Sequence, residues 1–224
     1  MLKALILIAA LLVAGPGLIV AAEKAPEGDA AYQEAFVAFK AGKLEEALQR
    51  VDAMLLRAPA PARVLELKGR ILHRKGEPEK AEPFFFMALE RDPEWVSAHF
   101  HLGEAAFRRK EWSDALQYYL IHLKHVPGSK ATILKLVYCQ VASDQLTQAA
   151  QFILGLDPSD EYEPGYYFAR AAMALASGKT KEATDVLAQA RTIYGNDVYA
   201  VYEPDFLFLR KNVTWPRSNT PAAK

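Results

Sequence analysis

The feature that most constrains the fold of this chain is an alanine that returns at a constant interval. Five alanines lie 34 residues apart, namely Ala47, Ala81, Ala115, Ala149 and Ala183. A constant period of roughly 20–50 residues is typical of proteins in which one supersecondary unit is stacked on the next. The chain has 224 residues, which is enough for a short array of such units. The period therefore predicts five repeated units.

Other positions keep the same register around each alanine. Five residues before it the chain has Gly42, Gly76 and Gly178, with Lys110 and Asp144 in the third and fourth units. Twelve residues before it the side chain is small or a valine, at Ala35, Gly69, Gly103, Val137 and Ala171. Four residues after it the side chain is large and apolar, at Val51, Phe85, Tyr119, Ile153 and Leu187. Twelve residues after it the chain has Pro59, Pro93 and Pro127, while the fourth and fifth units have an early Pro158 and Gly195.

These positions predict two helices that cross closely and are joined by a tight turn. Small side chains on both helices permit a close crossing. A glycine lets the chain leave the first helix through a positive φ. A proline ends the second helix because it has no N–H and its ring clashes with the preceding turn. Pro83 lies only five residues after Pro78, so we expect it to kink its helix rather than break it.

Over residues 28–195 this register resembles the tetratricopeptide repeat, whose unit is a helix–turn–helix of 34 residues. The resemblance implies an all-α fold, a right-handed superhelical solenoid of about five such units with a C-terminal capping segment. We expect a linker at residues 23–29 and the array at residues 30–194. Residues 195–215 are expected to cap the array, with a short helix from Pro204 to Lys211, or alternatively to bind a partner or a neighbouring copy. Residues 216–224 are expected to form a disordered tail.

The first 22 residues have the pattern of a signal peptide. Lys3 gives a short positive region, residues 4–14 are uninterruptedly apolar, and a Gly-Pro-Gly break follows. Small residues at Ala21 and Ala22 favour cleavage after Ala22. The alternative is an uncleaved anchor, because residues 4–22 are nearly long enough to span a bilayer. The pattern predicts a periplasmic or secreted protein, or else one anchored to the cytoplasmic membrane and facing the periplasm.

Charge and candidate reactive residues argue against several classes of function. The net charge is zero, whereas nucleic-acid binders usually carry a basic surface. Cys139 falls at a repeat position that is apolar in the other units, which predicts a buried packing thiol. His99 and His101 lie on different sides of a predicted helix, and His122 and His125 have no third ligand in the sequence. We therefore expect no catalytic residues, no metal site and no cofactor, and we interpret the chain as a protein that is not an enzyme.

The family that the chain resembles binds extended peptides or helices on the concave side of its superhelix, which the first helix of each hairpin lines. Carried over by repeat offset, the resemblance implies a partner-binding groove. Its residues are Tyr32, Phe36, Phe39, Lys40, Arg70, His73, Arg74, Phe100, Glu104, Phe107, Arg108 and Tyr138. We expect this groove to be aromatic at one end, basic and mixed in the middle and apolar at the other end. Aromatic and arginine side chains are enriched at binding hot spots.

Two other interpretations of the groove residues stay open. Aromatic residues such as Phe36 and Phe168 are also expected where neighbouring units pack. The three groove arginines could form a solvated face paired with Glu66 and Glu104 at helical spacing. The sequence predicts an exported scaffold or adaptor that binds a protein partner through its concave groove, in bacterial envelope assembly or a periplasmic complex. The alternative is a membrane-anchored structural subunit that assembles through its N-terminal helix and its C-terminal segment.

Overall fold

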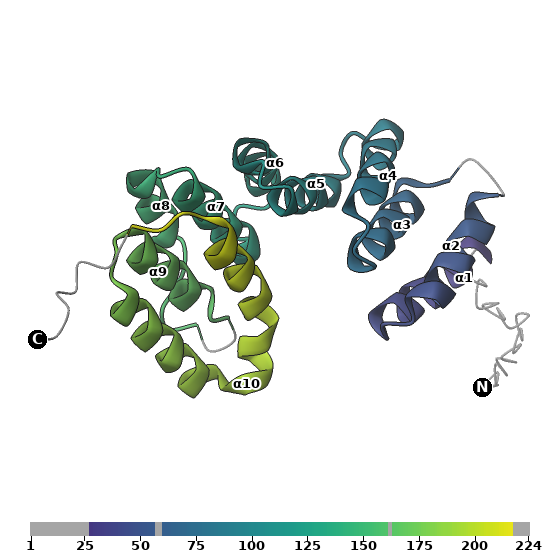
Figure 1. Ribbon diagram of the computed structural model, residues 1–224. Helices are drawn as coiled ribbons and strands as arrows, with labels where there is room; N and C mark the ends of the chain where they lie inside the picture. Colours follow the sequence, from purple (N-terminus) through teal and green to yellow (C-terminus); the bar gives the residue numbers. More distant parts are fainter. Residues whose placement is uncertain (1–26, 57–59, 161–162, 217–224) are drawn as a thin grey trace, which may run out of the picture.

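The computed structural model describes residues 27–56, 60–160 and 163–216, and in these ranges all regular secondary structure is helical (Figure 1). The helices are α1 (Glu27–Lys40), α2 (Leu44–Leu55), α3 (Ala62–Arg74), α4 (Pro78–Arg91), α5 (Val96–Arg108), α6 (Trp112–His125), α7 (Lys130–Ala142), α8 (Leu146–Ile153), α9 (Gly165–Ala176) and α10 (Thr180–Asn212). Successive helices pair as hairpins, from α1 with α2 to α9 with the first half of α10. The hairpins follow one another along the molecule from the purple end to the green end in Figure 1. This confirms the predicted all-α array of helix–turn–helix units.

The repeated alanines lie where the helices of each hairpin pack. All five are buried, and four of them have no exposed surface at all. The small residues on the first helices are required as well. A Cβ atom on Gly69 would lie 2.5 Å from Cε1 of Phe85, and one on Gly103 would lie 2.6 Å from Cε1 of Tyr119. In these two units the large side chain of the second helix therefore occupies the space that the glycine of the first helix leaves.

Each first helix ends in the same left-handed turn. The backbone φ is positive at Gly42, Gly76 and Gly178, and also at Lys110 and Asp144, which take the place of glycine in the third and fourth units. In every unit the N–H of this residue bonds to the carbonyl three residues back, and the next N–H bonds to the carbonyl five residues back. This pair of bonds is the Schellman motif. The turn geometry therefore follows the register even where the residue is not glycine.

Helix α4 continues through Pro83, which was predicted not to break it. Two boundaries differ from the prediction. Helix α1 begins at Glu27, inside the predicted linker. After the break at Gly195, where φ is 76° and ψ is 170°, the chain is helical to Asn212, and Pro204 lies inside this helix rather than in its first turn. The helix is longer than predicted because the chain folds back onto the array and contacts it between Tyr199 and Phe208. We call residues 196–212 the C-terminal arm.

Parts of the predictions fall outside the described residues. The predicted signal peptide lies within residues 1–26, and nearly all of the predicted tail lies within residues 217–224. Among the residues that the structure does describe, no helix combines the length and the apolar character needed to cross a membrane.

Candidate partner-binding groove

The first helices carry the predicted groove residues, and these residues divide into an open part and a covered part. The open part is formed by α1 and α3. The covered part is formed by α5, α7 and α9, where the C-terminal arm lies against them, as the yellow end of α10 shows in Figure 1. The sequence predicted one continuous groove, so this division is a finding of the structure.

Helix α1 contributes a row of aromatic rings to the open part. Tyr32, Phe36 and Phe39 follow at spacings of four and three residues, which place them on one helix face. The ring centroids of Tyr32 and Phe36 are 6.1 Å apart, and those of Phe36 and Phe39 are 6.3 Å apart. Phe39 is buried, whereas Tyr32 and Phe36 are half-buried and Lys40 at the end of the row is exposed.

Helix α3 lays arginines over these rings. The guanidinium carbon of Arg70 is 5.6 Å from the ring centroid of Phe36 and 5.0 Å from that of Phe39. The guanidinium of Arg74 is 5.4 Å from the Phe39 ring, and its Nη1 donates to the Phe39 carbonyl oxygen at 3.0 Å. Such stacking holds a guanidinium flat against a ring and leaves its outward edge able to bind a carboxylate. No carboxylate of the described residues forms an ion pair with Arg70 or Arg74.

The nearest acidic residue of α3 is engaged elsewhere. Glu66 is buried, and its Oε2 accepts a hydrogen bond from Nε1 of Trp95 at 2.9 Å. Its Oε1 lies 3.0 Å from Nε2 of His101. Burial favours the neutral acid, but the contacts with His101 and Trp95 outweigh it and lower the pKa of Glu66. The interpretation of Arg70 and Arg74 as a face neutralised by Glu66 therefore does not hold.

The middle of the array is filled rather than open. Burial lowers the pKa of His73, which is half-buried beside the charges of α5. The ring of Phe100 packs between His101, Tyr119 and His122, with centroid distances of 5.3–5.7 Å. Phe100 therefore acts mainly as a contact between α5 and α6.

In the covered part, aromatic side chains of the arm pack against those of the array. Phe107, Tyr138 and Phe168 have no exposed surface. The ring centroid of Phe208 lies 5.4 Å from that of Phe107, and Phe206 lies 6.5 Å from Tyr138 and 5.8 Å from Phe168. Phe107 and Tyr138, which were predicted to line an open groove, are thus covered by the chain itself.

A cluster of charges lies beside these rings. Asp205 of the arm forms an ion pair with Arg108 of α5, and its Oδ2 lies 2.8 Å from Nζ of Lys135 of α7. Lys135 also lies 2.6 Å from Oε1 of Glu104, and only 7% of its side chain is exposed. Burial opposes ionisation of Lys135, but the carboxylates of Glu104 and Asp205 outweigh it and raise its pKa. Sequence reasoning missed Lys135 and Asp205, although a lone lysine within the apolar run of α7 was a visible signal.

Three of the remaining candidate reactive residues, Cys139, His122 and His125, have structural surroundings. Cys139 is buried as predicted, and burial raises the pKa of its thiol to about 12. Nδ1 of His122 lies 2.8 Å from Oγ1 of Thr132, and Nδ1 of His125 lies 2.9 Å from the Ile121 carbonyl oxygen. Within the described part of the chain, no group of three His, Cys, Asp or Glu residues could hold a metal ion.

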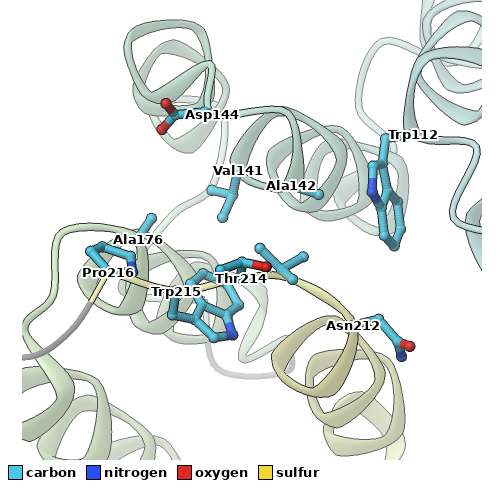
Figure 2. A pocket seen from close by; sticks show the side chains of 10 residues that line it. Trp112, Val141, Ala142, Asp144, Ala176, Asn212, Thr214, Trp215 and Pro216 are labelled. Atoms are coloured by element: carbon cyan, nitrogen blue, oxygen red, sulfur yellow. The ribbon is translucent and has the colours of Figure 1, made fainter.

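A hollow of about 600 Å³ lies outside the predicted groove, at the carboxyl ends of α7 and α9 (Figure 2). It is lined by Trp112, Val141, Ala142, Asp144, Ala176, Asn212, Val213, Thr214, Trp215 and Pro216. In Figure 2 Val141 and Ala142 face Thr214 and Trp215 across the hollow, while Asp144 and Trp112 stand far apart at its sides. It contains no cluster of catalytic groups.

Stacked helical hairpins with an exposed face on their first helices define a protein of the helical-repeat, solenoid class. A family model described as "Tetratricopeptide repeat" matches residues 32–94 and 87–130. Residues 32–130 are therefore similar to the tetratricopeptide repeat family. A comparison with curated protein sequences finds no match.

Solved structures of other repeat proteins have the same fold. MamA 41-end from Desulfovibrio magneticus RS-1 aligns with a TM-score of 0.63 at 17% identity, over 74% of this chain and 94% of that one. TTC0263, a thermophilic TPR protein in Thermus thermophilus, aligns with a TM-score of 0.62 at 18% identity, over 80% and 99%. YrrB, described as a TPR protein with an unusual peptide-binding site, aligns with a TM-score of 0.58 at 17% identity, over 78% and 90%.

Proposed function

We propose that this chain is an exported scaffold or adaptor that binds a protein partner through the concave face of its first two units. The partner presents a segment with both acidic and large apolar residues. The match to the tetratricopeptide repeat model supports a role in protein–protein interaction. The described peptide-binding site of YrrB supports a peptide segment as the ligand.

One observation carries the proposal, namely that Arg70 and Arg74 stack on Phe36 and Phe39 and have no carboxylate partner among the described residues. The rings hold the guanidinium groups in place, so little side-chain entropy is lost when they bind. An arginine can pair with a carboxylate through two parallel hydrogen bonds. The half-buried Tyr32 and Phe36 beside them offer contact area to an apolar side chain.

Export is part of the proposal and is supported by the sequence of the first 22 residues. The setting that it favours is a complex of the bacterial cell envelope. The alternative subunit would assemble through its C-terminal segment, but Phe206 and Leu209 of that segment are buried within the same molecule. The adaptor is therefore the better-supported function.

The experiment is capture of a partner from an envelope extract by the protein and by its R70E/R74E variant. We expect the variant to keep its helical content and to lose the partner, because the substituted groups repel carboxylates. The control is R91E/K124E, which makes the same change in charge at exposed positions of α4 and α6. If R70E/R74E captures the same partner as the control does, the open part of the groove is not the binding site.

A further inference from the structure

We infer that the C-terminal arm is an internal ligand. It occupies a binding seat for a helical segment with acidic and aromatic residues, and such a segment of a protein partner displaces it. The seat is formed by Phe107, Arg108, Lys135, Tyr138 and Phe168 on α5, α7 and α9. This inference rests on the proposed function, because it assumes that the concave face binds partners. It adds a second binding position and the chemistry of its occupant.

The charges of the seat show what it selects. Arg108 and Lys135 both contact Asp205, and the second carboxylate at Lys135 comes from Glu104 of the array itself. Without an acid from the occupant, Arg108 would have no described carboxylate and the buried Lys135 would keep only one. A buried charge that loses a partner is strongly unfavourable, so the seat requires an acidic occupant.

The rings of the seat select two aromatic side chains that follow that acid in the sequence. Phe206 follows Asp205 directly and packs on Tyr138 and Phe168, while Phe208 packs on Phe107. The guanidinium of Arg108 also lies 4.9 Å from the ring centroid of Phe208. An acid followed by two aromatics at alternate positions therefore describes the preferred segment.

The open part of the groove repeats this chemistry. Arg74 occupies the same repeat position as Arg108, and it stacks on Phe39 as Arg108 stacks on Phe208. The difference is that the arm supplies a carboxylate to Arg108, whereas Arg74 has none from the described residues. One partner segment, or two, could thus bind along the concave face by a single type of contact.

Several features make the arm a replaceable cover rather than a permanent part of the core. It is joined to the array through Gly195, where the helix is broken by a positive φ. Pro204 lies inside it and cannot donate a helical hydrogen bond. The hydroxyl of Tyr138 is buried beneath it without a hydrogen-bond partner among the described residues. Such an unpaired group weakens the cover, and a partner that bonds to it would bind better.

The test uses the arm as its own probe, a labelled peptide with the sequence of residues 198–212. The full-length D205K/F208A variant weakens the internal arm and leaves every seat residue unchanged. We expect it to bind the peptide at least ~10-fold more tightly than wild type, because the seat is free in a larger fraction of molecules. The V201S/L207S control alters two exposed arm residues and should bind like wild type. A peptide carrying D205K should bind none of them.

Equal peptide binding by wild type and a folded D205K/F208A variant would overturn the inference. If that variant loses its helical circular dichroism signal, the inference is tested instead by amide hydrogen exchange of the wild-type protein. Arm amides should then exchange at least ~10-fold faster than those of α7, because the arm opens without the array. Equal protection of the arm amides and the α7 amides would show that the arm is a permanent helix of the core, and this would also overturn the inference. Since the probe is the chain's own sequence, the result does not depend on whether R70E/R74E loses a partner.

Discussion

Ala81 and Ala115 lie at helix crossings where no space remains for a larger side chain. Both are fully buried, as are the rings of Phe85 and Tyr119 four residues later. Those rings fill the space over Gly69 and Gly103 on the facing helices. At the scale of single residues, the fold therefore depends on a few small positions, and most other positions are free to vary.

Replacing these alanines by leucine tests the packing directly. Ala81→Leu or Ala115→Leu should overpack the crossing and reduce the free energy of unfolding by about 1–3 kcal/mol. The control Ala131→Leu adds the same side chain at an exposed site of α7 and should change stability by less than about 0.5 kcal/mol. Urea denaturation measures all three. Unchanged midpoints for both buried variants would show that the repeat register is wrong.

At the scale of elements, the C-terminal arm is the feature that changes the groove most. Asp205 on the arm meets Arg108 on α5 and Lys135 on α7, so one carboxylate joins three helices. Burial alone would raise the pKa of Asp205, but Lys135 and Arg108 outweigh it, and the folded pKa is lowered. The ionised form of Asp205 therefore holds the arm in place.

This shift predicts an acid dependence of the arm. A folded pKa below the unfolded one gives stability that is fully present above the unfolded value, about 3.9 for Asp, and is lost as the pH falls through the folded value. Acidification should therefore weaken the arm contact in wild type and much less in Asp205→Asn, which cannot titrate there. Urea midpoints at neutral pH and at successively lower pH measure the difference. Parallel pH profiles for the two proteins would contradict the proposed role of Asp205.

The array could be predicted from the sequence because its rule is local and repeated. The register placed the left-handed turns even at Lys110 and Asp144. It also predicted that the open part of the groove would carry aromatic and basic side chains. It did not predict that Arg70 would stack on Phe36. The arm could not be predicted in this way. Arg108 and Asp205 are 97 residues apart, and no periodicity relates them, so the covering of Phe107 and Tyr138 followed only from tertiary packing.

At the scale of the whole molecule, the protein combines a repeat array, an open basic and aromatic face and a second position that the arm occupies. Other exposed apolar side chains form an alternative candidate for the binding surface. Phe86 and Met87 of α4 and Leu120 and Ile121 of α6 occur at matching repeat positions on the second helices, and all are exposed. Among the described residues no arginine stacks on Phe86 as Arg70 and Arg74 stack on Phe39, so we place the partner on the first helices.

The proposed export predicts the mass of the mature protein. The small residues before Glu23 favour cleavage after Ala22, so protein exported from a bacterial host should begin at Glu23. Intact mass spectrometry of the periplasmic fraction measures this. A species that keeps residues 1–22 and is recovered with membranes would instead support the anchored alternative.

The most direct test of the central claim is site-specific photo-cross-linking to the captured partner. Benzoylphenylalanine placed at Phe36 lies in the open groove, and the same group placed at Phe86 lies on α4, where the native ring is 42% exposed. We expect a cross-linked partner from position 36 and none from position 86, and we expect R70E/R74E to lose the product at position 36. A cross-link from position 86 alone would contradict the claim and would move the binding site to the second helices.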